Sequence, residues 1–336
     1  MFTACAFDIS EVVEQGNAGL VDASLRNAVG KSCQHIAAEY GSCEVLRILV
    51  AINCMEITEE VVKAAAGNTG NGKEVMALLL EKRGDDFKIT EEVVKAAAGN
   101  PGNGKEVMAL LLEKRGDDFK VTEEVKRGDD FKITEEVVKA AAGNRGNGKE
   151  VMALLLEKRG DDFKITEEVI EAAAGNTGNG KEVMALLLEK RGDDFKITEE
   201  VIEAAAGNRG NGKEVMALLL EKRGDDFKIT EEVVKAAAGN SENGQVMPWN
   251  RGIGKEVMAL LLEKRGDDVE ITEEVVKAAA GNEACGEKIM AFLLRQRLSS
   301  VRASIKDEVY LTASTCGQVG VIELLSRHFS HCPIKE

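Results

Sequence analysis

The chain has 336 residues, is 44% hydrophobic and carries a formal net charge of −15, with a pI near 5.0. This acidic balance argues against binding to nucleic acid or to anionic lipid, because both need clustered Lys and Arg. No apolar run is long enough to cross a bilayer, and the amino terminus lacks the basic and apolar stretches of a signal peptide, so we expect an intracellular protein of the cytoplasm or nucleus.

An N-terminal helical cap is expected over residues 1–30, followed by one repeat unit over residues 31–56. From residue 57 to residue 282 the phrase ITEEVVKAAAGNxGNGKEVMALLLEKRGDDFK recurs almost letter for letter, with a period of 32 residues. A fixed period of this size predicts a solenoid, in which one helical unit stacks on copies of itself as a continuous body. The copies begin at Ile57, Ile89, Ile133, Ile165, Ile197, Ile229 and Ile271.

Each copy predicts two helices joined by a short turn. In the copy at Ile57, Thr58 is the expected N-cap of helix A, which Gly67 ends as a C′ residue. A turn of Gly and Asn leads to helix B over residues 73–83, and residues 84–89 connect it to the next copy. Helix A is rich in alanine and helix B in leucine. Successive A helices should therefore lie closer together than successive B helices, with helix A on the concave side of the stack.

Two places interrupt the array. Residues 121–132 (VTEEVKRGDDFK) form a truncated copy that lacks the alanine and leucine runs. A second irregularity is the insertion at residues 241–252, which contains Trp249. We expect an irregular connector at the truncated copy and two sub-stacks, about 1–120 and 133–336. Slippage between near-identical repeats or a gene-model error explains both places, and a functional hinge or binding loop is the alternative.

Two segments outside the regular array carry a family resemblance. Residues 32–50 read SCQHIAAEYGSCEVLRILV, with His35, Gly41 and Glu44 at positions typical of ankyrin repeats, which this segment resembles. Residues 311–325 (LTASTCGQVGVIELL) are similar, and residues 283–336 are expected to form a divergent ankyrin-like C-terminal cap. The central copies keep the A-A, N-G, E-V and L-L-L letters of the ankyrin pattern, so the resemblance extends over most of the chain.

The resemblance implies a fold and a kind of function. Ankyrin units carry a β-hairpin finger between consecutive helix pairs, and the connector here is too short for one, so the fingers should be mostly lost. The resemblance also implies that His35 ties down loop backbone and that the array recognises proteins. Arrays of near-identical copies resemble those of receptor-like proteins in filamentous fungi.

The residue pattern predicts neither a metal site nor a cofactor. The cysteines lie near the two ends of the chain, are odd in number and show no C-x-x-C spacing, which favours buried reduced thiols. His328, His331 and Cys332 lie close together, but a fourth zinc ligand and the usual spacing are lacking.

A glycine-rich string provides the strongest indication of chemistry. Residues 67–73 match G-x-x-x-x-G-K, the core of a phosphate-binding loop. Glu74 then stands where Ser or Thr should bind Mg²⁺, and an alanine-rich helix precedes the string in place of a strand. The same string recurs in five copies. We therefore expect a turn between helices, no nucleotide binding and no catalytic residue, and a nucleotide-binding switch is the alternative.

The copies differ from one another mainly at two predicted surface positions. One lies in the turn and the other on the outward stripe of helix A, where the charge itself changes sign. Free drift of exposed residues explains such variation, and tuning of a recognition surface is the functional interpretation. We assign partner binding to Lys63, Lys95, Lys139, Glu171, Glu203, Lys235, Lys277, Thr69, Arg145 and Arg209.

The sequence thus predicts an all-α, ankyrin-like αα-hairpin solenoid. Its expected function is recognition of a protein partner along the concave helix A face, without catalysis and without a small-molecule substrate. A structural or decayed repeat fragment that has no ligand is a second alternative, which the two irregular copies favour.

Overall fold

The computed structural model describes residues 2–8, 26–51, 57–83, 89–116, 133–160, 163–192, 194–240 and 253–329. Within these ranges the regular elements are helices and no strand occurs, so the predicted all-α class is confirmed. The chain divides into two compact units, residues 1–165 and 166–336, and each is described by itself.

Helices of two kinds, A and B, alternate along both units. The first unit contains the A helices α3 (Cys33–Tyr40), α5 (Glu59–Gly67), α7 (Glu91–Ala98) and α9 (Glu135–Ala142), and the B helices α4 (Cys43–Ala51), α6 (Gly72–Arg83), α8 (Gly104–Gly116) and α10 (Gly148–Arg159). The second unit contains the A helices α11 (Glu167–Gly175), α13 (Glu199–Gly207), α15 (Glu231–Gly239), α17 (Glu273–Gly281) and α20 (Asp307–Thr315). Its B helices are α12 (Gly180–Arg191), α14 (Gly212–Arg223), α16 (Ile253–Arg265), α18 (Gly286–Gln296) and α21 (Val319–His328).

Three short elements complete the described part of the chain. Helix α1 (Phe2–Ala6) packs on α3 at the start of the first unit. In the second unit, the 3₁₀ turn η2 (Gly224–Asp226) follows α14, and α19 (Leu298–Ser304) lies between α18 and α20. The predicted N-terminal cap falls largely on residues 9–25, which lie outside the described residues.

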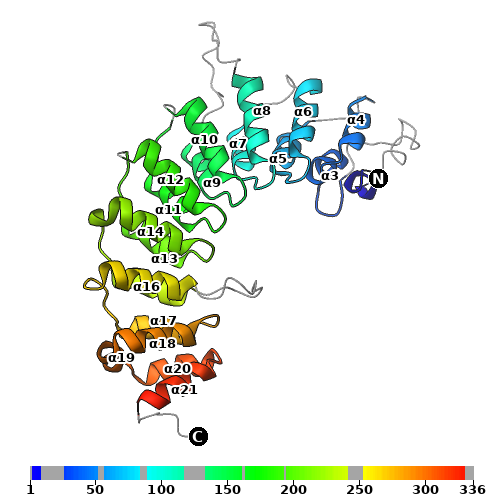
Figure 1. Ribbon diagram of the computed structural model, residues 1–336. Helices are drawn as coiled ribbons and strands as arrows, with labels where there is room; N and C mark the ends of the chain where they lie inside the picture. The colour runs from blue at the N-terminus through cyan, green and yellow to red at the C-terminus, as the bar shows by residue number, and fades with distance from the viewer. Residues whose placement is uncertain are drawn as a thin grey trace. The chain divides into compact units, whose positions relative to one another are not determined.

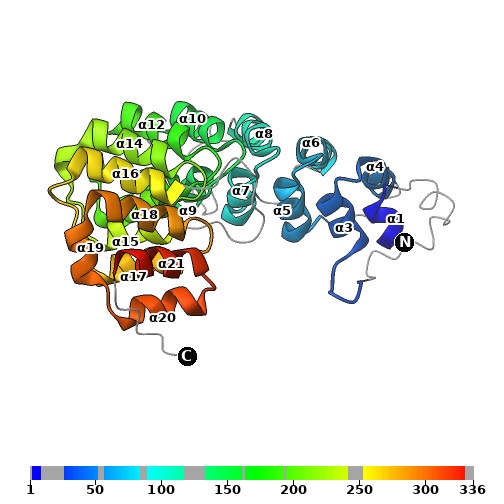
Figure 2. The same ribbon diagram turned by 60° about the horizontal axis from the view of Figure 1, so that its bottom comes forward.

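Within each unit the A helices form one row and the B helices another (Figures 1 and 2). Each A helix packs on the next A helix and on its own B helix. Successive A helices approach one another more closely than successive B helices, as the contrast between alanine and leucine predicts.

The core repeats the same few side chains in every copy. In the copy at Ile57, Val61, Val62, Ala65 and Ala66 of α5 are buried, and α6 contributes Val75, Met76 and Leu79. The buried side chains of helix A are therefore small or β-branched, and those of helix B include longer ones. Helices of this length are marginal alone, so each copy depends on its neighbours for stability.

The helix ends differ from the predicted capping in two ways. Thr58 is the N-cap of α5, but its side chain makes no capping hydrogen bond, and the same is true of Thr90 and Thr134. Gly67 does not adopt a left-handed conformation, because the described glycines with positive φ are Gly30, Gly41 and Gly317. The predicted role of Gly67 is therefore wrong, and the turn is held by a different residue, described below.

The predicted division into sub-stacks 1–120 and 133–336 is also wrong, because α7 packs on α9 and α8 packs on α10, as in the regular copies. The irregular connector predicted at residues 121–132 lies outside the described residues. The stack therefore continues past these residues, and the two compact units do not divide at 120–133. The physical reason is that the truncated copy has no apolar core, so the complete copies on either side of it pack directly together.

The connectors between copies are anchored by apolar side chains. In the second unit, Phe195, Ile197, Phe227 and Ile229 are buried. Arg223 adds a polar link, because its Nη1 donates to the carbonyl oxygen of Gly192 at 2.6 Å. No strand is present in residues 194–198 or 224–230, as expected from connectors too short for a finger.

Candidate functional site

The predicted recognition residues lie on the A helices and on the turns that follow them. Six of them are exposed: Lys63, Thr69, Arg145, Glu171, Glu203 and Arg209. The other four are partly buried: Lys95, Lys139, Lys235 and Lys277. We call the surface formed by these helix A and turn positions, within each unit, the A face.

The lysines of the first unit bridge consecutive copies on the A face. Lys63 Nζ lies 2.5 Å from Glu92 Oε2, and Lys95 Nζ lies 2.8 Å from Glu136 Oε2. The hydrogen bond from each lysine holds the pKa of the partner carboxyl below its usual value. Each lysine therefore neutralises the second glutamate of the next A helix, a pairing that the single-copy pattern does not show.

A second polar link runs in parallel with the ion pairs. The hydroxyl Oγ1 of Thr90 donates to Glu59 Oε1 at 2.7 Å, and Thr134 donates to Glu91 in the same way at 2.7 Å. Thr230 makes the equivalent contact with Glu199 in the second unit. The threonine hydroxyl thus joins neighbouring copies, and in Thr230 and Thr272 it also accepts a capping hydrogen bond, from Val233 N and Val275 N.

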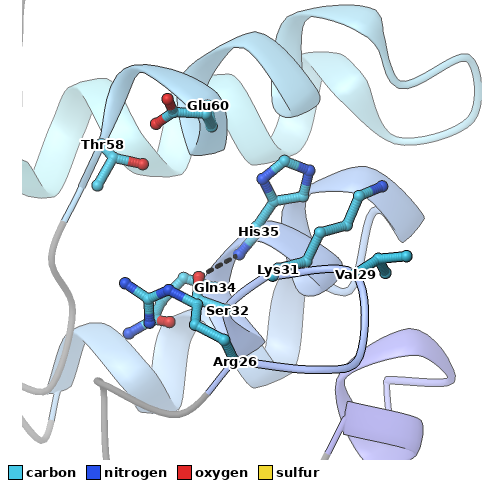
Figure 3. A pocket seen from close by; sticks show the side chains of 9 residues that line it. Arg26, Val29, Lys31, Ser32, Gln34, His35, Thr58 and Glu60 are labelled. Carbon is cyan, nitrogen blue, oxygen red and sulfur yellow. Dashed lines mark hydrogen bonds between the residues drawn. The ribbon is translucent and has the colours of Figure 1, made fainter.

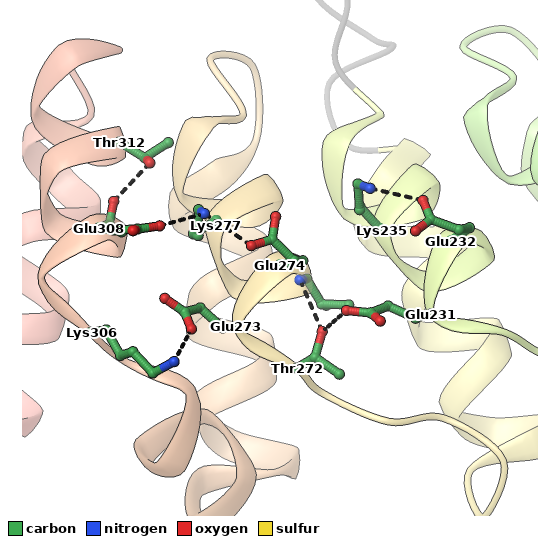
Figure 4. A network of polar contacts seen from close by, with 11 residues as sticks. Glu231, Glu232, Lys235, Thr272, Glu273, Glu274, Lys277, Lys306, Glu308 and Thr312 are labelled. Carbon is green, nitrogen blue, oxygen red and sulfur yellow. Dashed lines mark hydrogen bonds and ion pairs between the residues drawn. The ribbon is translucent and has the colours of Figure 1, made fainter.

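The far end of the second unit carries a denser network (Figure 4). Lys277 Nζ lies between Glu274 of its own helix, at 2.9 Å, and Glu308 of α20, at 2.7 Å. Glu308 and Glu274 raise the pKa of Lys277, and the hydrogen bond from Lys277 lowers the pKa of Glu308. Lys306 pairs with Glu273 at the same interface. The lysine at this end is therefore fully engaged by the protein itself.

The acidic members of the A face are arranged differently. Glu171 and Glu203 occupy the helix A position that holds lysine in the other copies, and both are exposed. Neither forms an ion pair with any of the described residues. Glu200 and Glu232 correspond to Glu92 and Glu136, the carboxylates that pair with a lysine of the preceding copy in the first unit. Glu232 accepts instead from Lys235 of its own helix at 2.8 Å. The A face of α11 and α13 is therefore negative.

The structure brings three predicted residues together around one hollow of about 410 Å³ in the second unit. Glu203, Arg209 and Lys235 line it, together with Glu232. Small residues make up much of the remaining surface: Gly207, Ala236, Gly239 and Ala278. The hollow lies on the A face of α13, α15 and α17, and opens between charged side chains of both signs.

The turn after each A helix is organised by a buried asparagine. In the copy at Ile197, Asn208 Nδ2 donates to the carbonyl oxygens of Ala174 and Asn176 in the preceding copy, at 2.7 and 3.1 Å. Its Oδ1 accepts from the backbone N–H groups of Gly210 and Asn211, at 2.9 and 3.1 Å. We call the set of equivalent residues the asparagine ladder: Asn68, Asn100, Asn144, Asn176, Asn208, Asn240 and Asn282.

The asparagine ladder bears directly on the G-x-x-x-x-G-K string. A phosphate-binding loop needs free backbone N–H groups that converge on the phosphate. In the turn that precedes Lys73, Asn68 Oδ1 already accepts from the N–H groups of Gly70 and Asn71, at 3.0 and 2.7 Å. The string therefore forms a turn between two helices, and its inward donors are occupied.

A second hollow, of about 490 Å³, lies at the start of the first unit (Figure 3). Its lining includes Arg26, Lys31 and His35 on one side and Glu60 of α5 on the other. Burial lowers the pKa of His35, and the charge of Lys31 lowers it further. Lys31 is bound to Glu39 at 2.6 Å. This hollow contains none of the residues predicted for partner binding.

Cysteine and histidine chemistry is limited in the described part of the chain. Cys5, Cys33, Cys43, Cys285 and Cys316 carry free thiols. In the part of the chain that the structure describes, no group of three or more His, Cys, Asp or Glu side chains could hold a metal ion. His328 Nδ1 lies 2.9 Å from the carbonyl oxygen of Leu324, and His331 and Cys332 lie outside the described residues.

The stacked helix pairs and the repeated surface positions define a helical repeat protein of the solenoid class. One family model, described as a domain of unknown function (DUF7104), matches the chain repeatedly, over residues 53–76, 78–108, 110–125, 126–152, 154–184, 186–216, 218–247 and 260–290. These matches cover more than half of the chain, which therefore belongs to the DUF7104 family. No match is found among curated proteins. None of the helices in the described ranges has the length and apolar character needed to span a membrane.

Proposed function

We propose that this chain is an ankyrin-like protein-interaction module that binds a protein partner along the A face. The observation that carries the proposal is the position of the differences between copies. The asparagine ladder repeats without change and the core position of helix A varies only between Val and Ile, whereas charge reversals fall on exposed positions of the A face. Because the A row is the more tightly packed row, each unit should bend toward it and present the A face as a groove.

Local geometry supports the ankyrin-like part of the proposal. Ser32 caps α3, with its Oγ accepting from the backbone N–H of His35 at 3.1 Å. Gly41 ends the helix with φ at 75°, a left-handed value that glycine adopts readily. Residues 27–31 form a turn before α3, in which Asn27 N donates to the carbonyl oxygen of Lys31. A turn, a helix that ends at Gly41 and a second helix directly after it are consistent with the resemblance in this segment.

The proposal involves no catalysis and no nucleotide. The donors of the G-x-x-x-x-G-K turns are already bonded to the asparagine ladder, and Glu74 adds a negative charge next to Lys73. We also infer an intracellular place of action, because free thiols persist in reducing compartments.

The test compares two faces of the same unit. A partner is first isolated by capture on the intact chain, and its affinity is then measured for two double variants. Glu171→Lys with Glu203→Lys changes the A face, whereas Glu189→Lys with Glu221→Lys places the same charge change on exposed positions of helices α12 and α14. We expect the A-face variant to bind about tenfold more weakly, mainly through the association rate.

Helicity and melting temperature serve as controls for folding in both variants. The proposal is wrong if no protein is retained by the intact chain above the level retained by an unrelated acidic protein. It is also wrong if the helix B variant loses binding while the A-face variant keeps it.

A further inference from the structure

Resting on the proposed function, we propose that the A face of α11 and α13 binds an extended, lysine- or arginine-rich segment of the partner. A basic side chain of that segment would enter the hollow beside Glu203. The inference comes from a charge that the described residues leave unbalanced and from the shape of the surface beside it.

The charge imbalance follows from comparison with the lysine copies. Lys63 meets Glu92 at 2.5 Å and Lys95 meets Glu136 at 2.8 Å, which places these helix A positions within reach of the next copy's glutamate. In α13 the same position is Glu203 and the next copy's glutamate is Glu232. The ion pair between copies is therefore missing at this interface, and none of the described cations, Arg209 and Lys235 of the hollow included, forms an ion pair with Glu203.

The hollow offers a place for the missing cation. In the first unit an ion-paired lysine spans the corresponding surface between consecutive A helices. Glu203 is shorter and does not pair with Glu232, and Gly207 and Gly239 add no side chain, so the surface stays open. Adding a Cβ at Gly207 would meet no atom within 4 Å. A hollow of about 410 Å³ falls within the size range of ligand sites in proteins.

The charges around the hollow determine in which direction the basic segment of the partner should extend. Lys235 is bonded to Glu232, so the carboxylate without an ion pair in the hollow is that of Glu203. Glu171 extends the negative surface along α11. Arg209 lines the hollow and forms no ion pair with the described residues, so it would repel a further basic residue. The basic run of the partner should therefore end near Arg209, where an acidic residue would fit better.

The experiment uses the full chain and two short fluorescein-labelled peptides, one in which lysine alternates with serine and one in which glutamate does. Fluorescence anisotropy at low salt should show binding of the lysine peptide. Glu203→Lys with Glu171→Lys should weaken it about tenfold, because the new lysines can pair with Glu200 and Glu232 as Lys63 pairs with Glu92. The matched pair Glu189→Lys with Glu221→Lys should change it less than about twofold.

A second variant tests whether binding of the lysine peptide can be introduced at another copy. Lys63→Glu with Thr69→Arg builds the Glu203 and Arg209 combination into the copy at Ile57, and should increase the amount of lysine peptide bound. Equal weakening by both double variants would show general attraction by an acidic protein and would overturn the inference. Absence of lysine-peptide binding, with the captured partner still dependent on Glu171 and Glu203, would overturn the inference and leave the proposed function standing. If the captured partner does not depend on them either, both fail.

Discussion

At the scale of single residues, the asparagine ladder contributes most to the specificity of stacking. Asn100, Asn144 and Asn282 each satisfy two carbonyl oxygens of the preceding copy and two N–H groups of their own turn, as Asn208 does. Asn208 is only 3% exposed, so these backbone groups have little access to water. Buried groups left without a partner cost more than the hydrogen bond itself contributed.

Replacement of Asn208 by alanine should therefore destabilise the chain by about 3 kcal/mol, because buried backbone groups lose their partner. The measurement is the urea midpoint of the intact chain. Arg209→Ala is the matched control, since this exposed neighbour should change stability by less than about 0.5 kcal/mol. Equal effects of the two variants would contradict a special role for the ladder.

Glycines of the turn differ sharply in what they allow. A Cβ at Gly210 would lie 1.9 Å from the carbonyl oxygen of Thr177 in the preceding copy, whereas one at Gly207 would meet nothing within 4 Å. Gly210→Ala should cost about 2 kcal/mol or more, since the two turns must move apart. Gly207→Ala should be neutral or stabilising by up to about 1 kcal/mol, because alanine favours the helix. Thermal unfolding of the two variants side by side distinguishes them.

At the scale of helices and connectors, the contacts between copies do not depend on the number of residues that separate them. Asn100 donates to Ala66, 34 positions earlier, and Asn144 makes the same bond to Ala98, 46 positions earlier. Lys63 and Lys95 likewise meet glutamates at separations of 29 and 41 residues. The additional residues of the truncated copy are therefore not needed for packing.

Deletion of residues 121–132 should leave the fold intact, because Lys120 would then join Ile133 through the same connector sequence that the regular copies use. We expect an unchanged or higher melting temperature and a higher helical signal per residue. Deletion of the equally long segment 201–212 removes most of α13 and Asn208, and should unfold the second unit. A loss of stability on deleting 121–132 would indicate a role for these residues that packing does not explain.

Much of this element pattern can be predicted from the sequence, because the apolar period and the Thr and Gly boundaries lie within one copy. The links between copies cannot, since they depend on how far a side chain reaches across the interface. The contact between Lys63 and Glu92 is one such link. The sequence identifies Asn68 as a turn residue but does not show that its side chain is buried and bonded to the preceding copy. The one signal is that an asparagine recurs at this position in the complete copies, including Asn282, where the following residues differ. Gly67 shows the opposite case, because the sequence predicts that it ends the helix as a C′ residue, but it is itself the last helical residue, and Asn68 is the C-cap.

At the scale of the whole molecule, the ion pairs between copies make stability depend on pH. The pKa values of Glu92, Glu136 and Glu308 are lowered in the folded chain by lysines of neighbouring copies. A carboxyl whose pKa is lower in the folded state stabilises the fold above its unfolded pKa and loses that contribution as pH falls through the folded value. The burial that lowers the pKa of His35 acts in the same direction at a higher pH.

We therefore expect the melting temperature to fall in two steps on acidification. The first begins as pH drops below 6.5, where unfolded histidine gains a proton that folded His35 resists. The second begins near 4.5, where the glutamates of the unfolded chain are protonated first. His35→Asn should remove the first step, and Lys63→Met with Lys95→Met should flatten the second. An unchanged acid limb in the lysine variant would show that these exposed pairs do not contribute to it.

The uneven spacing of the asparagine ladder along the chain also has a mechanical consequence. Successive members that are hydrogen-bonded in space are separated by 32, 44 or 42 residues in sequence, as in Asn100 with Asn68, Asn144 with Asn100, and Asn282 with Asn240. If the chain is pulled by its ends and the copies unfold one at a time, each unfolding event lengthens the chain. The added length depends on the number of residues between successive ladder asparagines and not on the distance between copies in the stack. At full extension of about 3.5 Å per residue, the releases would be roughly 110, 150 and 145 Å. A force-extension record would thus show a regular series of steps interrupted by two longer ones, whose order reports the direction in which the array comes apart.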